Sequence, residues 1–496
     1  MELLKEFKGL TINSPSDRAS EEFELDYQEN LPAYLDDVEK IIKCSSNCSI
    51  VDYEINSGCI NLYGKTIISI TYLSSQGFLL SNVFEEDFTK AVDIAKKDNI
   101  CFADVRLKTK YSSSRLINQR RIDVHISLNA VINCFEKNSL NVMSNCKNAF
   151  VREYKTQILQ NRYISVSLTD FDETFSVSGD SQIKNITNVF TQSSIEEYKL
   201  IKEKMLVKIK TQVSVLYKSD DENIQRFQYS FITSKIADVP NCQEEDNVLL
   251  EADISSLYVK TKTDSDNKIN EIELVGRIAV RYKIFSIEEE EFITDSYLPK
   301  YNANLSFENA MIQVNPVEIS QDAVTRLEIQ SETPIAEVLD MNAVVIDSEI
   351  VDSVLKFSAK VSLLYFDSDS DIRYTEKLVS QELRLSDTSQ KGVCSVNLIS
   401  ADYVINNSDT ISVKLNLSYT AFIFDEKSLD FVSDIEENGL KDMSNSSPLT
   451  LYFADKGENI WDIAKEFSAD LIKLSEDNKL TGDVINEKKI LLISEM

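Results

Sequence analysis

The sequence predicts a mainly β protein: three tandem antiparallel β domains, each a sandwich or barrel-like sheet, followed by one small α/β domain. Two observations support this prediction. Apolar and polar residues alternate over long stretches that recur three times before residue 430, and a period of two is typical of half-buried strands. Residues 449–496 instead show helical spacing between two short strand patterns.

One strand pattern occurs in three copies that end in tyrosine. The copies span residues 60–72, 205–217 and 353–365. Their tyrosines are 145 and then 148 residues apart, and a repeat of this length corresponds to a whole domain. We therefore expect Tyr72, Tyr217 and Tyr365 at equivalent places in three similar domains.

A second alternating pattern lies downstream in each copy. It starts at Ile122, Ile272 and Ile411, and an aromatic residue follows thirteen positions later in each case: Phe135, Phe285 and Phe424. Polar segments such as 56–58, 219–222 and 367–371 separate the strands, as turns do. The acidic clusters lack the fixed spacing and glycine of a calcium loop, so we interpret them as solvated loops.

These repeats set the predicted domain boundaries. The three β domains span residues 31–145, 146–300 and 301–430, and residues 1–30 form an N-terminal segment without a template. Residues 431–448 are polar and acidic, which predicts a flexible linker. Residues 449–496 form the last domain.

The chain is strongly acidic, with 82 Asp and Glu against 52 Lys and Arg and a net charge of −30. This charge opposes nonspecific binding to nucleic acid or to an anionic membrane. Residues 101–155 are an exception, with ten basic and four acidic residues. The basic residues that dominate this stretch are Arg106, Lys108, Lys110, Arg115, Arg120 and Arg121. Two interpretations stay open: a solvated strand face, or an electrostatic docking face.

The residue types that carry catalysis are scarce. The only histidine, His125, lies within an alternating strand pattern, so we predict a structural role for it. The sequence has no G-x-S-x-G motif and no glycine-rich phosphate loop. Eight cysteines, at positions 44, 48, 59, 101, 134, 146, 242 and 394, form no C-x-x-C pair. We predict no catalytic residue, no cofactor and no metal site, and an enzyme is the least favoured class.

The N-terminal residues lack the basic start and the apolar core of a signal peptide. No run of 18 apolar residues occurs that would span a membrane as a helix. We therefore expect a cytoplasmic protein with reduced thiols and no transmembrane segment.

Residues 449–496 predict a strand, two short helices and a strand. Asn459 and Asp470 stand where helix N-caps are expected, because their side chains accept hydrogen bonds from free backbone N–H groups. The apolar residues at helical spacing are Ile460, Trp461, Ile463, Ala464 and Phe467 in the first helix and Leu471 and Leu474 in the second. The apolar run 490–493 predicts the closing strand.

This segment resembles a LysM domain. The matching positions, with no gap, are Tyr452, Gly457, Ile460, Trp461, Ile463, Ala464, Phe467 and Asn478. The resemblance implies a groove for N-acetylglucosamine polymers between the loop after the first strand and the loop before the last. Both loops differ from the usual pattern, because Glu458-Asn459 replaces Asp-Thr and Asn486-Glu487 replaces Pro-Gly.

The candidate binding face of this domain consists of Gly457, Glu458, Asn459, Ile460, Trp461, Ile463, Asn478, Asn486 and Glu487. For Ile463, as for Ala464 and Phe467, a place in the small core is the favoured reading, whereas Trp461 stays open between core and partner contact. Burial of Glu458 and Glu487 against a neutral sugar would leave their charges poorly compensated. We therefore expect a protein partner rather than a glycan.

The three β domains resemble SPOCS domains, the β domains of clostridial spore-coat proteins. Leu216-Tyr217 and Leu364-Tyr365 match the strand end of that pattern, whereas Thr71-Tyr72 departs at its first position. Tandem SPOCS domains followed by a LysM domain are similar to a family of spore-coat morphogenetic proteins, over residues 31–496.

This resemblance implies a non-catalytic adaptor made in the mother cell and placed at the forespore surface. In that family the LysM domain binds SpoIVA, the ATPase of the coat basement layer, and the protein thereby tethers the coat to the forespore surface. Other coat proteins are expected as further partners. The alternative is a protein that binds peptidoglycan or another N-acetylglucosamine polymer.

Overall fold

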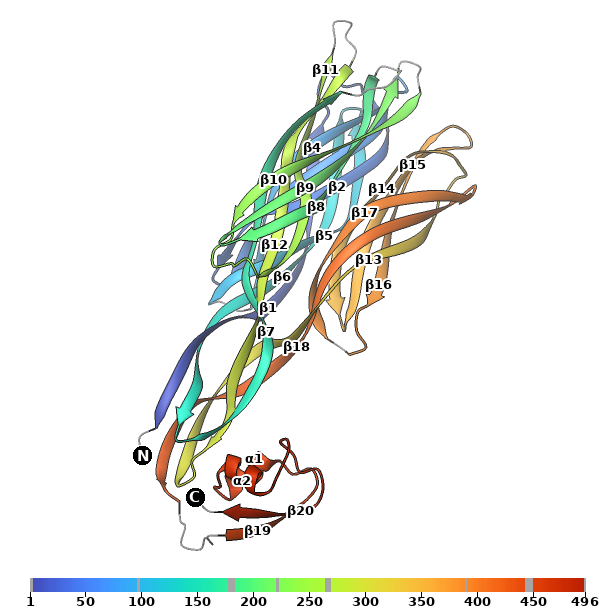
Figure 1. The fold of residues 1–496 in the computed structure, drawn as a ribbon. Coiled ribbons are helices and arrows are strands. Elements are labelled where there is room, and N and C mark those ends of the chain that lie inside the picture. The colour runs from blue at the N-terminus through green and yellow to red at the C-terminus, as the bar shows by residue number, and fades with distance from the viewer. Residues whose placement is uncertain are drawn as a thin grey trace.

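The structure is a computed structural model that describes residues 3–95, 99–176, 183–219, 223–263, 269–388, 390–441 and 449–494. Within these residues almost the whole chain is antiparallel β structure, and the two helices lie near the C-terminus (Figure 1). The predicted fold class, mainly β with a small C-terminal α/β part, is confirmed.

Three consecutive groups of six strands share one strand order, and we call them units 1, 2 and 3. Unit 1 consists of β1 (Leu4–Asn30), β2 (Val38–Asn56), β3 (Cys59–Ser74), β4 (Leu79–Asp93), β5 (Ile100–Asn118) and β6 (Arg121–Lys147). Unit 2 consists of β7 (Phe150–Ser176), β8 (Ile183–Ile201), β9 (Lys204–Ser219), β10 (Ile224–Asp238), β11 (Asn247–Thr263) and β12 (Ile269–Tyr297). Unit 3 consists of β13 (Tyr301–Gln330), β14 (Ile335–Val351), β15 (Val354–Asp367), β16 (Ile372–Arg384), β17 (Lys391–Asn407) and β18 (Thr410–Leu440).

Each unit is a sandwich of two antiparallel sheets. The second, third and fourth strands pair side by side on one face, and the sixth strand pairs with the first and the fifth on the other. Two single bridges, Ile183–Ile269 and Ile158–Val314, connect the two sheets of unit 2 to each other and to β13, β18 and β17 of unit 3. In unit 1, alternate residues of β3 and β6 meet in one core, among them Ile60, Leu62, Ile122 and Val124, all at most 1% exposed. Period-two patterns in both sheets thus produce one apolar interior per unit.

The three repeat tyrosines occupy equivalent places. Tyr72, Tyr217 and Tyr365 are buried two residues before the ends of the middle strands β3, β9 and β15. The turn after each strand is closed by the same type of backbone hydrogen bond. The donor and acceptor pairs are Ser74 N–Phe78 O, Ser219 N–Asn223 O and Asp367 N–Asp371 O, at 2.8–2.9 Å.

Two segments that the sequence analysis set apart from the β domains lie within strands. Residues 4–30 form β1, which pairs with β6 from Asn30 opposite Arg121 to Leu4 opposite Lys147. Residues 431–440, placed at the start of the linker, are the last part of β18 and pair with β13. The alternation of apolar residues does not predict β1, because β1 is an edge strand with mostly exposed side chains and carries Pro15 next to a bulge. Residues 442–448 of the predicted linker lie outside the described residues.

The first and sixth strands of each unit continue beyond the sandwich as a two-stranded ribbon. The ribbons, residues 4–14 with 136–147, 150–160 with 286–297, and 301–314 with 425–440, pack together into a stalk (Figure 1). All three units contribute to its apolar core, whose buried members include Leu10, Ile12, Val142, Ile158, Phe292, Ile312, Val314, Leu429 and Phe431. Phe135, Phe285 and Phe424 lie next to the register shifts where the stalk begins.

The units contact one another in a closed cycle. The fourth strand of each unit touches the second strand of the next, in the pairs β4–β8, β10–β14 and β16–β2. The second strands also touch the fifth strands of the following unit, in the pairs β2–β11, β8–β17 and β14–β5. The chain is therefore arranged around an approximate three-fold axis, like a trimer made from one polypeptide.

Residues 449–494 form a separate module with the predicted element order. It consists of β19 (Leu449–Ala454), α1 (Ile460–Glu466), α2 (Leu471–Asp477) and β20 (Lys489–Ser494). Both predicted N-caps are confirmed. The Asn459 side chain accepts from the backbone N–H of Trp461, and that of Asp470 accepts from Ile472 and Lys473. β19 pairs only with β20 among the described strands.

Candidate functional site at the C-terminal module and on the central axis

The C-terminal module docks on the tip of the stalk through α1 (Figure 1). The rings of Trp461 and Tyr297 lie edge to face at 5.1 Å between centroids, and Phe150 stacks on Tyr297 at the same distance. Trp461 is only 5% exposed. Its role, which the sequence left open between core and partner contact, is to pack against the chain's own stalk.

Hydrogen bonds reinforce this contact around Asp295. The Trp461 indole N–H donates to the Asp295 carboxylate at 2.8 Å, and Lys465 donates to both carboxylate oxygens at 2.6 and 2.8 Å. Burial raises the pKa of Asp295, but the hydrogen bonds from Lys465 and Trp461 outweigh it and hold the pKa below its usual value. Tyr297 adds a hydrogen bond from its hydroxyl to the Ala469 carbonyl at 2.9 Å.

Four residues of the predicted binding face have structural roles inside the module. Ile460 and Ile463 are buried at 3% exposure, and Asn459 caps α1. The Asn478 side chain is buried and bridges α2 to β20: it donates to the carbonyls of Leu474 and Leu492 and accepts from the Leu492 N–H. Together with Trp461, these side chains hold the module together or to the stalk.

The other four residues lie on two neighbouring loops at the module surface. Gly457 adopts φ = 96°, which glycine tolerates without strain, and donates to the Ile485 carbonyl at 2.8 Å. The Glu458 carboxylate accepts from the Tyr452 hydroxyl and the Asp455 N–H. Asn486 and Glu487 are exposed. The structure thus brings Gly457, Glu458, Asn486 and Glu487 together where the LysM resemblance implies a groove.

The side of the module away from α1 carries an exposed apolar surface, which we call the outer face. It consists of Leu449, Leu451, Phe453, Ile490 and Leu492, which are 54%, 62%, 73%, 52% and 36% exposed. Leu451 lies opposite Leu492 and Phe453 opposite Ile490, so their side chains are cross-strand neighbours. Neither β19 nor β20 contains an acidic residue.

The outer face was not predicted, although the sequence contains a signal for it. A two-stranded sheet with helices on one side buries only every second residue. The unbroken apolar runs 451–454 and 490–493 therefore leave alternate apolar side chains uncovered.

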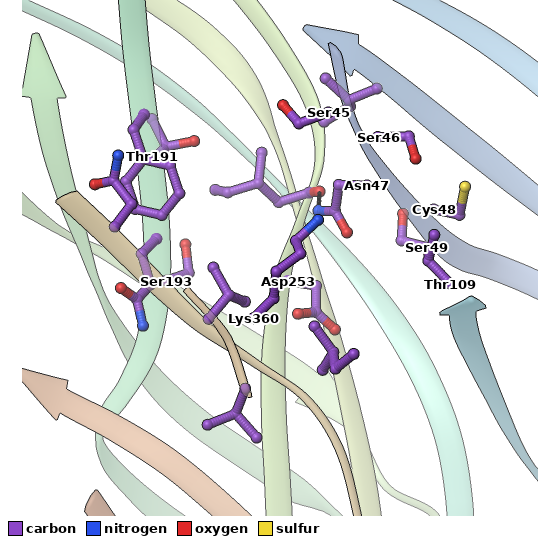
Figure 2. Close-up of a pocket in the computed structure, with 18 of the residues that line it drawn as sticks. Ser45, Ser46, Asn47, Cys48, Ser49, Thr109, Thr191, Ser193, Asp253 and Lys360 are labelled. Carbon is purple, nitrogen blue, oxygen red and sulfur yellow. Dashed lines mark hydrogen bonds between the residues drawn. The ribbon is translucent and has the colours of Figure 1, made fainter. Parts of the chain in front are cut away.

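A cavity of about 300 Å³ lies on the central axis between the three units (Figure 2). Equivalent segments of their second strands line it: residues 43–50 of β2, 188–194 of β8 and 342–348 of β14. Polar side chains, among them Ser45, Asn47 and Thr191 in Figure 2, line it together with apolar ones, and the buried hydroxyls of Ser46 and Ser49 have no hydrogen-bond partner among the described residues. A space of this size with such polar groups accommodates ordered water.

His125 is engaged in side-chain contacts, and Cys134 and Cys394 are buried thiols. One ring nitrogen of His125 lies 2.7 Å from the Asp26 carboxylate and the other 3.2 Å from the Tyr111 hydroxyl, and the hydrogen bond with Asp26 raises the pKa of His125. All eight cysteines are free thiols. Burial raises the pKa of Cys134 and Cys394 to about 11, so these thiols stay protonated. Across the described ranges, no three His, Cys, Asp or Glu side chains meet in a way that could hold a metal ion.

Comparison with known protein families finds matches in two of the three units. A family model described as SipL, SPOCS domain, matches residues 37–112 and 182–262. These two segments are thus similar to SPOCS domains of the SipL family. The matches cover β2 to β4 and most of β5 in unit 1, and β8 to β11 in unit 2, so the same four strands are recognised twice. Unit 3 has the same strand order.

The SPOCS assignment connects the chain to sporulation and the spore coat, through a structural rather than an enzymatic family. Neither a curated protein nor a solved structure matches the chain. In the part of the chain that the structure describes, neither helix is long and apolar enough to cross a membrane.

Proposed function

We propose that the protein is a non-catalytic adaptor of spore-coat assembly that acts on the mother-cell side of the forespore surface. Its LysM-like C-terminal module binds the coat basement-layer ATPase SpoIVA, and its SPOCS units hold further coat proteins. The two SPOCS matches and the LysM resemblance of residues 449–496 support this role. The adaptor holds its partners at high effective concentration, because several binding surfaces belong to one chain.

The outer face of the module is the surface we assign to SpoIVA, and its exposure is the observation that carries the proposal. Five neighbouring apolar side chains are exposed at the far end of the molecule (Figure 1). Contiguous exposed apolar patches on soluble proteins mark interaction sites. The opposite side of the module is already occupied by the stalk, through Trp461 and Tyr297. The outer face is therefore an apolar surface of the module that the described residues leave open to a partner.

Replacement of Phe453 or Leu451 by Asp in the full chain tests this assignment. Both side chains are more than 60% exposed, so the fold should tolerate the change. We expect binding to purified SpoIVA to weaken at least tenfold, because a carboxylate would be buried in an apolar contact. Ile472→Asp is the matched control, since Ile472 is 64% exposed but lies on α2. Unchanged binding by both outer-face variants would contradict the proposal.

Calorimetry with chitin oligomers separates the adaptor from the glycan-binding alternative. We expect no heat of binding from the full chain, because Glu458 and Glu487 border the loops on which sugar would sit. Tight binding that Phe453→Asp leaves intact and that SpoIVA does not compete with would favour an N-acetylglucosamine-binding protein.

A further inference from the structure

The three units carry different charges at equivalent positions around the axis. Lys43, Asn188 and Asp340 each lie opposite the residue that precedes the repeat tyrosine: Thr71, Leu216 and Leu364. All three side chains are buried, at 8%, 4% and 4% exposure. One position thus holds a cation in unit 1, an amide in unit 2 and an anion in unit 3.

Two further positions on the fifth strands repeat this scheme. At the first position, Arg106, Glu251 and Ser395 lie opposite Val131, Arg281 and Thr420, each of which comes nine residues after the start of the second repeat pattern of its unit. At the second position, Lys108, Asp253 and Asn397 lie opposite Asn129, Ala279 and Ser418, each of which comes seven residues after that start. In both sets unit 1 supplies a cation, unit 2 an anion and unit 3 a neutral polar group.

Arg106 and Lys108 make contacts across the boundaries between units. Arg106 is 3.7 Å from the Glu251 carboxylate of unit 2 and donates to the Ser348 carbonyl of unit 3 at 2.9 Å. Lys108 pairs with Asp347 of unit 3 at 2.7 Å.

Lys43 and Asp340, at the buried position on the second strands, also contact neighbouring units. The Lys43 ammonium lies over the Tyr374 ring of unit 3, and Asp340 of unit 3 is 3.6 Å from Arg226 of unit 2.

The same polarity continues outside the central region. Among the described residues, unit 1 also supplies the cation in three ion pairs with its neighbours: Lys5–Asp434, Lys8–Glu290 and Arg18–Glu349, at 2.5, 2.8 and 3.8 Å. Residues 1–147 hold 17 basic and 21 acidic residues, whereas residues 301–440 hold 9 basic and 24 acidic ones. The basic stretch 101–155 therefore supplies, through Arg106 and Lys108, part of a docking face used within the chain.

We propose that these charges are a recognition code which makes the three similar units close around the axis in one order and within one chain. Partly buried ion pairs add little net stability, because desolvation offsets their attraction, but an unmatched buried charge is costly. Three copies of unit 1 would place only cations at these positions. The code therefore excludes closure between like units of different chains, an alternative that their shared fold would otherwise permit.

A reversal of the Lys108–Asp347 pair in the full chain tests the code. The variants are Lys108→Glu, Asp347→Lys and the double variant, and both side chains are partly exposed, which lets each unit keep its own fold. We expect each single variant to show a larger radius of gyration in small-angle scattering, or oligomers in light scattering. The double variant should return to the compact monomer of the native chain.

Lys208 and Glu197 provide the matched control, because they also pair at 2.7 Å but lie within unit 2. Reversal of this pair should leave the radius of gyration and the monomer unchanged, singly and together. Far-UV circular dichroism establishes that strands persist in all variants. Single variants at positions 108 and 347 that remain compact monomers, or a double variant no more compact than the single ones, would overturn the proposal.

Discussion

The indole N–H of Trp461 donates a hydrogen bond of 2.8 Å to the carboxylate of Asp295, across the contact between module and stalk. Asp295 follows a register shift in β12, which lies between Ile293 and Asp295. A bulge of this kind changes the direction in which a strand's side chains point. The relationship thus depends on a local irregularity of one strand and on a helix 166 residues later.

Asp295→Ala should release the module from the stalk without unfolding it. The change removes the acceptor for Trp461 and Lys465, and hydrogen bonds to a charged group contribute about 1.5–3 kcal/mol each. Trp461 is the only tryptophan in the chain, so its fluorescence reports this contact alone. We expect emission at longer wavelength. Glu291→Ala, which changes an exposed carboxylate in the same strand, should leave the emission unchanged, and equal spectra for both variants would refute the docking role.

Ile463→Arg should unfold the C-terminal module. Ile463 is 3% exposed within the module core, and a buried unpaired charge is among the few single changes that cost several kcal/mol. Ile472→Arg is the control, since that side chain is 64% exposed on α2. Limited proteolysis should cut the module only in the Ile463 variant. A protease-resistant Ile463→Arg module would show that this side chain is not required for the core.

Gly276→Ala should destabilise unit 2. A Cβ at this position would lie 2.2 Å from the Ser256 carbonyl oxygen and 2.7 Å from the Phe171 ring, so the strands must move apart. Overpacking of this kind costs about 1–3 kcal/mol. Gly9→Ala meets no atom within 4 Å and serves as the control. Urea denaturation should show a lower midpoint for the Gly276 variant alone, and equal midpoints would contradict the close approach.

Glu29→Gln should stabilise the protein at pH 8 but not at pH 4. Burial, followed by the nearby Glu86 carboxylate, raises the pKa of Glu29 from 4.5 to about 7. The pKa of Glu29 is higher in the folded than in the unfolded protein. The contribution of protonated Glu29 to the free energy of unfolding is therefore fully present below pH 4.5 and is lost as pH rises through about 7. The loss is on the order of 2–3 kcal/mol. Thermal melts of both proteins across this range check the prediction. A difference that does not grow between pH 4 and pH 8 would count against it.

The strand content, the repeat and the helix caps could be predicted because each depends on residues close in sequence. Tyr72, Tyr217 and Tyr365 end alternating strands whose pattern is visible locally, and Asn459 and Asp470 cap helices within three residues. β1 could not be predicted in this way. Its register depends on β6, whose residues lie 91 to 143 positions later than their partners in β1, and an edge strand needs few apolar side chains.

The candidate site was predicted only in part, for a related reason. The sequence identified the module and its two exposed loops, which contain Gly457, Glu458, Asn486 and Glu487. It could not predict which surface covers Trp461. The hydrophobic gain depends on the apolar area buried, and an apolar residue on a short helix buries the same area against its own domain or against another one. Asp295 and Tyr297 decide between these options, and they are distant in sequence.

The sequence by itself determined three β repeats, a strand–helix–helix–strand ending and an excess of negative charge, since periodicity, capping and composition are local properties of the chain. Only the tertiary structure decided that the units close around one axis, that the basic residues of unit 1 face acids of units 2 and 3, and that α1 packs against the stalk while apolar side chains of β19 and β20 stay exposed. These features depend on which surfaces meet. Residues such as Lys108 and Asp347 acquire a role only when folding brings them to 2.7 Å across 239 positions of the chain.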